Sequence, residues 1–368
     1  MVGGSAGSWA AGSYRASDVT FLLKQVQMAP TEVALKERLI QSGAAHYSEM
    51  ISQERRPDAR YLAIFEAARA KGAARIAAEM SGLARRIIGD IASGVLAPQI
   101  TLCSLVRAGV PYGVVLHREL VALGVDSCHF GVSIIRDRGL DGNALAYILD
   151  RRPVAGVVFV DGWTGKGAIA QELQTSWQAL TGRAAAPLAV LADPGGFATM
   201  AGSHEDWLIP SGILGANVSG LISRSILNRA VIGADDFHGA VAVDHLADID
   251  VSLPFVDQIS ALMAGQRTAE VAPARGVDLH ALRTRALGAV KAIAAQYGVA
   301  NLNRIKPGIA EATRAVLRRR PKLVFVRAAD DPDLAALIHL CRTDGIEMVE
   351  DAALTGPYRA ITLIEKVA

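Results

Sequence analysis

The residue types and spacing best suited to chemistry occur in a glycine-rich segment at residues 161–167. It reads Asp161-Gly162-Trp163-Thr164-Gly165-Lys166-Gly167, between an apolar run at 157–160 and a helical pattern that follows Gly167. Glycines in such a turn let backbone N–H groups approach an oxyanion, and the helix start adds free donors and a positive dipole end. The segment therefore predicts a phosphate site, where the Asp161 carboxylate accepts hydrogen bonds from ligand hydroxyls.

Two other interpretations of this segment are possible. A nucleotide-triphosphate P-loop needs a glycine five residues before Gly165 and a serine or threonine after Lys166. The chain has Val160 and Gly167 at those positions, so the P-loop pattern fails twice. An ordinary strand-to-helix turn, in which Asp161 is only a cap, stays open as the alternative.

A second candidate anion site follows the apolar run at 100–105. Arg107 stands there in a turn of small residues, where its planar guanidinium suits bidentate binding of pyrophosphate. A solvated arginine in a plain loop is the alternative. Because ligands of open α/β sheets bind at the carboxyl ends of the strands, two such turns on consecutive strand-helix units predict one crevice.

The elements that would position both turns alternate along the chain. Strands are expected near 100–105, 128–135, 157–160 and 188–192 with helices between them, after helices at 30–43, 57–71 and 72–94. This alternation predicts an α/β domain at 14–263, with a doubly wound, mainly parallel sheet and an N-terminal helical cap. The small and polar segment 264–276 predicts a linker to a second, small α/β/α sandwich domain at 277–368.

The second domain is expected to begin with a helix that Asp278 caps and Gly298 ends. Strands are expected at 323–326, 347–350 and 360–364, with a helix near 334–341. Its segment 304–322 combines one acid, Glu311, with seven cations: Arg304, Lys306, Arg314, Arg318, Arg319, Arg320 and Lys322. Such a segment is either a solvated helix face or a patch that binds a nucleic-acid backbone.

The composition sets broad limits. A length of 368 residues with 51% hydrophobic residues suits two domains and excludes wholesale disorder, while a net charge of +2 indicates no class of partner. No apolar run approaches the roughly 18 residues of a membrane span and the N-terminus is unlike a signal peptide, so a cytoplasmic location is expected. Cys103, Cys128 and Cys341 lack CxxC spacing, so neither a disulfide framework nor a tightly bound protein metal site is expected.

Both turns also carry a family resemblance. The segment S-L-V-R-A-G-V-P-Y-G (104–113) resembles the pyrophosphate loop of type I phosphoribosyltransferases, and V-V-F-V-D-G-W-T-G-K-G (157–167) resembles their ribose-phosphate loop. The closer resemblance is to the phosphoribosyltransferase-like family of bacterial tellurium-resistance and stress operons, which is also labelled cysteine protease StiP. The segments G-I-A-E-A-T-R (308–314), P-K-L-V-F-V (321–326) and L-I-H-L-C-R-T-D-G-I-E (337–347) resemble the L7Ae or Pelota type of RNA-binding domain.

The resemblance implies a phosphoribosyltransferase that exchanges pyrophosphate and a nucleobase-like group at ribose C1. Phosphoribosyl pyrophosphate and a nucleobase-like acceptor would be the substrates, with Mg²⁺ carried by the pyrophosphate. Asp161 and Arg107 would be catalytic, and substrate would be bound by Ser104, Arg107, Ala108, Gly109, Asp161, Gly162, Thr164, Gly165, Lys166 and Gly167. RNA would contact the C-terminal domain at Gly308, Glu311, Arg314 and Arg318.

Two alternatives to this activity stay open. Most transferase loops carry paired acids where this chain has Asp161 and Gly162, which also suits a non-catalytic sensor of a phosphoribosyl ligand joined to an RNA-binding module. A cysteine peptidase is the other alternative, and it needs a thiolate beside a histidine. Cys128 and His129 are adjacent on an expected strand, where neighbouring side chains point to opposite faces.

Overall fold

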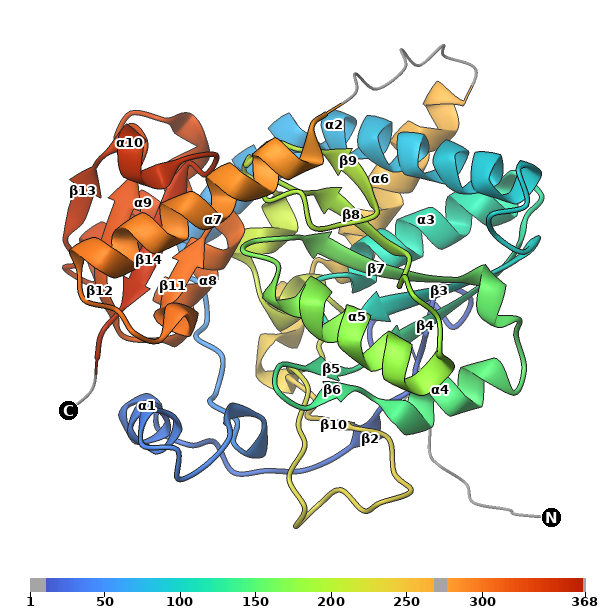
Figure 1. Ribbon diagram of the computed structural model, residues 1–368, viewed down its shortest axis with the longest axis horizontal. Helices are drawn as coiled ribbons and strands as arrows, with labels where there is room; N and C mark the ends of the chain where they lie inside the picture. Colours follow the sequence, from blue (N-terminus) through green and yellow to red (C-terminus); the bar gives the residue numbers. More distant parts are fainter. Residues whose placement is uncertain (1–10, 268–276, 367–368) are drawn as a thin grey trace.

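The computed structural model describes residues 11–267 and 277–366, which build two sheet-based domains (Figure 1). In the first domain, six strands follow the order β1-β4-β3-β7-β8-β9 and every neighbouring pair is parallel. The strands are β1 (Thr20–Phe21), β4 (Asp126–Val132), β3 (Gln99–Leu105), β7 (Val157–Trp163), β8 (Leu188–Ala192) and β9 (Met200–Ser203). The expected α/β class with a mainly parallel sheet is confirmed.

Helices cover both faces of this sheet, as Figure 1 shows. One face carries α2 (Ala59–Ala92), α3 (Val110–Ala122) and α6 (Ser252–Gln266), and the other carries α4 (Gly142–Leu149) and α5 (Ala168–Thr181). Alternate strand residues serve the two layers, since Leu102 and Val158 join the core under α2 and α3, whereas Cys103 and Phe159 join the core under α4 and α5. Burial on both faces explains why these strands are continuous apolar runs in the sequence.

The N-terminal cap differs from the expected set of helices. Helix α1 spans Val33–Gln41, and the two helices expected at 57–71 and 72–94 are one 34-residue helix, α2. Gly72 lies within that helix, where an added β-carbon would be 3.4 Å from ring atoms of both Trp207 and Pro210. Glycine costs a helix roughly 1 kcal/mol. At this position the absence of a side chain lets Trp207 and Pro210 pack closely against the helix, and the helix continues through Gly72.

Short elements complete the first domain. Strand β2 (Lys24–Gln25) pairs with β10 (Gly239–Ala240), and β5 (Ile134–Ile135) forms a hairpin with β6 (Gly139–Leu140). The strand expected at 128–135 is therefore divided between β4 and β5 at Ser133. Along the described residues, no helix has both the length and the apolar character to cross a membrane.

The C-terminal domain contains a four-stranded sheet in the order β11-β14-β12-β13, with helices on both faces. The elements are α7 (Leu279–Gln296), β11 (Ile305–Pro307), α8 (Ile309–Arg318), β12 (Pro321–Val326), α9 (Ala335–Thr343), β13 (Met348–Glu350), α10 (Ala352–Thr355) and β14 (Ala360–Ile364). Asp278 caps α7 by accepting a hydrogen bond from the backbone N–H of Ala281, as expected. Of the linker expected at 264–276, residues 264–266 belong to α6 and residues 268–276 lie outside the described residues.

The two domains share a hydrophobic core. Ile309 and Val316 of α8 and Leu337 of α9 belong to the same apolar cluster as Phe65 of α2 and Ile213. Helices α8 and α9 are thus packed between their own sheet and the first domain. The side of α8 that carries Glu311, Arg314 and Arg318 therefore faces the edge of the six-stranded sheet at which β3 and β7 end.

Candidate anion-binding site between the domains

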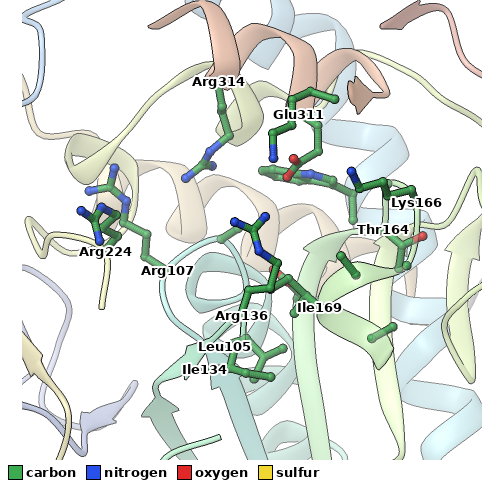
Figure 2. A pocket seen from close by; sticks show the side chains of 18 of the residues that line it. Leu105, Arg107, Ile134, Arg136, Thr164, Lys166, Ile169, Arg224, Glu311 and Arg314 are labelled. Atoms are coloured by element: carbon green, nitrogen blue, oxygen red, sulfur yellow. The ribbon is translucent and has the colours of Figure 1, made fainter. Parts of the chain in front are cut away.

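A cavity of about 360 Å³ lies between the two domains, a size within the usual range of ligand pockets (Figure 2). The segment after β7, the turn after β3, helix α1 and helix α8 all contribute to its wall. Among the residues that the structure describes, two acids line it, Asp161 and Glu311, against nine cations: Lys36, Arg107, Arg136, Lys166, Arg224, Lys306, Arg314, Arg318 and Arg319. We call this space the interdomain cavity.

The glycine-rich segment forms one side of the cavity and also holds the C-terminal domain. Gly165 accepts a hydrogen bond of 3.1 Å from the Tyr358 hydroxyl. The Lys166 ammonium donates to the carbonyls of Leu302 and, at 3.1 Å, of Ile305. Burial, and after it the charge of Lys306, lowers the pKa of Lys166 to about 7. A segment predicted to bind only a ligand is therefore also a contact between domains.

The polar side chains of this segment have defined environments. The Thr164 hydroxyl donates to Asp193, a buried carboxylate that also accepts from the backbone N–H groups of Phe197 and Ala198 at 2.9 Å. Asp161 lines the cavity and accepts from the Gly162 N–H at 2.8 Å. Burial raises the pKa of Asp161 to about 7. Its carboxyl group consequently titrates near neutral pH.

The turn after β3 places Arg107 in the cavity wall, where the carboxylate of Glu54 neutralises its charge. The buried guanidinium donates to the Ile222 carbonyl at 2.8 Å and forms an ion pair with Glu54. Although burial opposes it, the Arg107 charge lowers the pKa of Glu54 to about 2. A β-carbon on Gly109 would lie 2.0 Å from the Val160 carbonyl oxygen. Glycine is thus what allows this turn to approach β7.

Seven of the ten predicted substrate-binding residues line the cavity: Arg107, Ala108, Asp161, Thr164, Gly165, Lys166 and Gly167. The other three, Ser104, Gly109 and Gly162, are buried outside the lining. Ser104 forms a hydrogen bond of 2.7 Å with Nε2 of His129, and Nδ1 of that ring donates to the Asp18 carbonyl at 2.7 Å. Burial lowers the pKa of His129 to about 3, so this pair is a neutral core contact.

Helix α8 forms the opposite wall. Among the four predicted RNA contacts, Glu311, Arg314 and Arg318 line the cavity, whereas Gly308 does not. The helix start after Gly308 is occupied by Asp206 of the first domain, which accepts from the backbone N–H of Ile309 at 3.0 and 3.2 Å. The turn expected to grip RNA is therefore covered.

Arg314 and Arg318, like Lys306 of β11, are cations of the site whose charged groups lack a described hydrogen-bonding partner. Neither has a hydrogen bond or an ion pair with any residue that the structure describes; the Arg314 guanidinium lies 5.3 Å from the centre of the Trp163 ring. Burial, followed by the charge of Arg107, lowers the pKa of Arg314 to about 10. Burial and the charge of Arg314 also lower the pKa of Arg318. Figure 2 shows Arg136, Arg224 and Arg314 projecting from different elements toward the same space.

Three cations of the site were not among the site residues predicted from the sequence. Lys36 reaches the cavity from α1 and donates to Ser52 at 2.7 Å, Arg136 follows β5, and Arg224 donates to the Tyr47 carbonyl at 2.6 Å. Of the three, only Arg136 had a signal in the local sequence, the run of charged residues at 136–138.

Within residues 11–267 and 277–366, no group of three histidine, cysteine, aspartate or glutamate side chains is arranged to hold a metal ion.

Two family models match separate parts of the chain. Residues 12–260 match the family described as tellurite-like stress resistance cysteine protease StiP, and residues 284–366 match the PELOTA RNA binding domain. A protein of Acinetobacter baylyi named cysteine protease StiP is 45% identical over 367 residues, covering 97% of this chain and 94% of that protein. The resemblances to the StiP-labelled family and to Pelota domains are confirmed.

Solved structures are similar only at a low level. The hypoxanthine phosphoribosyltransferase of Trypanosoma cruzi has a TM-score of 0.29 and 18% identity, covering 35% of this chain and 76% of that one. An HPRT glutamine mutant has a TM-score of 0.28 and 15% identity over 35% and 76% of the two chains. Likeness at this level carries no argument about activity.

The expectation of phosphoribosyl transfer was wrong. The family that matches most of the chain, and the 45% identical relative, carry the name of a cysteine protease and not of a transferase. Phosphoribosyl pyrophosphate and a nucleobase acceptor therefore have no support as partners. In physical terms, a glycine-rich turn at a strand end is suited to anions in general and does not specify a reaction. Magnesium, expected to arrive with pyrophosphate, stays an untested prediction.

Proposed function

Because the chain belongs to the StiP family and its last part matches a Pelota domain, we propose that it binds RNA and holds backbone phosphates in the interdomain cavity. The observation that carries this proposal is the lining of nine cations against two acids. RNA is a repeating polyanion, and cationic side chains that neutralise its phosphates supply most of the affinity of such sites. The Pelota match supplies the class of ligand.

The free-energy cost of keeping several cations charged in the cavity supports a polyanionic ligand. Burial lowers the pKa of Lys36 and of Lys306 to about 8 and that of Arg224 to about 10. Arg107 is among the neighbours that lower the pKa of Arg224 further. Cations held this close destabilise the unliganded protein, and a ligand with several negative charges relieves their repulsion.

Arg314 and Arg318 are the side chains best suited to take the phosphates. Both belong to α8 of the Pelota-like domain, one helical turn apart, so they project from the same face. A guanidinium binds a phosphate through two parallel hydrogen bonds. Since neither side chain is engaged by a described acid, no existing ion pair has to break when a phosphate binds.

The test is fluorescence anisotropy of a labelled single-stranded RNA with the full chain at two salt concentrations. We expect the double variant Arg314→Ala with Arg318→Ala to bind at least about tenfold more weakly, because each charge-assisted contact contributes roughly 1.5 to 3 kcal/mol. Its log-log salt slope is expected to flatten by about 1.4, at about 0.7 per phosphate for single strands. Arg183→Ala, at an exposed position after α5, is the matched control. Unchanged affinity in the double variant would exclude the proposal.

A second candidate is peptide hydrolysis, which the name of the 45% identical relative favours. The thiol available in this chain is Cys128, half-buried in β4, because Cys103 and Cys341 are fully buried and burial raises the pKa of both. His129 follows it in the chain, but both ring nitrogens are engaged by Ser104 and Asp18. Among the described residues, no hydrogen bond joins a cysteine thiol to a histidine.

Hydrolysis of labelled casein separates this candidate from the first. If the candidate holds, Cys128→Ala abolishes hydrolysis while Cys103→Ala and Cys341→Ala retain it. Iodoacetamide should modify Cys128 in the folded protein and all three cysteines after denaturation, as read by mass spectrometry. Absence of hydrolysis in the wild-type chain, or its survival in Cys128→Ala, removes the candidate.

A further inference from the structure

The interdomain cavity continues into an open groove on one side. This outer groove has a volume of about 690 Å³ and shares Ile40, Tyr47, Arg136 and Arg319 with the cavity. Its remaining wall includes the cations Arg138, Arg304 and Lys366, the acids Glu49 and Asp137, and the amides of Asn301 and Asn303. Cations outnumber acids along this groove, so a path of net positive charge leads from the surface to the cavity.

On the other side the cavity ends in a recess of about 90 Å³. The recess shares Lys36, Arg107, Arg224 and Arg318 with the cavity, and beyond them its wall includes Tyr61 and Leu317. This volume has room for a few water molecules and not for a nucleotide. A nucleotide that enters from the outer groove is therefore too large to pass through the recess.

We infer that the interdomain cavity receives the phosphorylated end of an RNA strand, while the outer groove holds the nucleotides that follow. This inference rests on the proposed RNA binding. A strand interior needs an exit as wide as its entrance, and the recess, although exposed side chains such as Arg55 and Asp58 open it to solvent, is too narrow for a nucleotide. A terminal phosphate monoester carries about −1.5 to −2 at neutral pH, against −1 for each internal diester. The greater charge suits the place where buried cations are most concentrated.

The arginines of the cavity and those of the outer groove therefore have different roles in binding RNA. Arg314 and Arg318 bind the terminal phosphate, because they reach the cavity from α8 without a described acid as partner. Arg138 of the outer groove is exposed and lies 3.7 Å from Glu49, so it contacts only the passing backbone. The two groups should affect different properties of the RNA.

The experiment compares internally labelled RNAs of one sequence by anisotropy with the full chain. The ends carry a 5′-phosphate, a 3′-phosphate or hydroxyls alone, and a fourth RNA is circular. We expect one phosphorylated form to bind about tenfold more tightly than the hydroxyl and circular forms, and that form identifies the end that enters. Arg318→Ala should remove the difference, whereas Arg138→Ala should weaken all four RNAs alike. Arg314→Ala, with the melting temperature measured, repeats the test at a second position.

The outcomes separate the inference from the function on which it rests. Equal affinity for all four RNAs, with binding still lost in the arginine double variant, overturns recognition of the end and leaves RNA binding intact. Absence of binding to all four RNAs overturns the proposed function itself. A difference between the RNAs that survives in both Arg318→Ala and Arg314→Ala places end recognition elsewhere and also overturns the inference.

Discussion

Asp206 of the first domain caps the first turn of α8, accepting the backbone N–H of Ile309 with both carboxylate oxygens at 3.0 and 3.2 Å. The same carboxylate accepts the Arg359 N–H at 2.7 Å, so it holds two elements of the C-terminal domain. It takes the position that a helix-capping side chain or an anionic ligand would otherwise take. This contact fixes the direction in which α8 presents Arg314 and Arg318.

The cap should make stability depend on pH. Burial raises the pKa of Asp206 from 3.8 to about 6. The folded protein therefore holds this proton more tightly than the unfolded chain, and the resulting stabilisation is complete below pH 3.8 and lost as pH rises through 6. The difference is on the order of 3 kcal/mol, at 1.36 kcal/mol per pH unit.

We expect the free energy of unfolding of the wild type, minus that of Asp206→Asn, to decrease by most of this amount between pH 4 and pH 7. Urea denaturation of both proteins at several pH values measures it. A difference that stays constant with pH would show that Asp206 does not titrate in this range.

Gly109 should tolerate no side chain. An alanine β-carbon there would meet the Val160 carbonyl oxygen at 2.0 Å, so the turn after β3 would have to move away from β7. We expect Gly109→Ala to lower the free energy of unfolding by at least about 1 to 3 kcal/mol. Gly89→Ala is the control, because Gly89 is exposed within α2 with no atom near its added β-carbon, and it should stabilise by up to about 1 kcal/mol. Equal melting temperatures for the two variants would contradict this account.

Arg318 should be a residue whose removal stabilises the protein. Burial and the charges of Arg314 and Arg107 disfavour the ionised form of Arg318, and the charge of Glu54 offsets them only in part, so the pKa stays lowered. Replacing an unfavourable buried charge by an apolar side chain of similar length can stabilise by about 1 kcal/mol or more. We expect Arg318→Met to melt at a higher temperature than the wild type while binding RNA more weakly. A lower melting temperature would mean that Arg318 has a stabilising partner.

RNA affinity should increase as pH falls from 8 to 6. Burial raises the pKa of Asp161 to about 7, so its negative charge in the cavity disappears over this interval. Lys166, with a pKa lowered by burial to about 7, and Lys36 and Lys306, with pKa values lowered by burial to about 8, gain protons over the same interval and act in the same direction. Asp161→Asn should bind more tightly at pH 8 and retain only the lysine part of the pH dependence. Anisotropy titrations at three pH values test this, and identical pH profiles would exclude a role for Asp161.

Local pattern was sufficient for much of the fold. The continuous apolar runs at 100–105 and 157–160 predicted strands buried on both faces, since a parallel sheet covered by two helix layers has no polar side. The helix that Asp278 caps was also predictable, because the cap acts within three residues of chain. The division of 57–94 into two helices was wrong, because the close approach of Trp207 and Pro210 to Gly72 is a tertiary contact.

The sequence by itself determined that two turns able to bind anions lie at strand ends and that a basic helix follows in a second domain. These features depend on neighbouring residues, whose types set backbone geometry and charge. Only the tertiary structure decided how they combine: Arg107 is matched by Glu54, the start of α8 is capped by Asp206, and Arg314 and Arg318 have no described acidic partner. More than fifty residues separate Glu54 from Arg107, and about one hundred separate Asp206 from Ile309. Burial and charge pairing over such separations are properties of the packed chain, because they depend on which surfaces meet when the domains share a core.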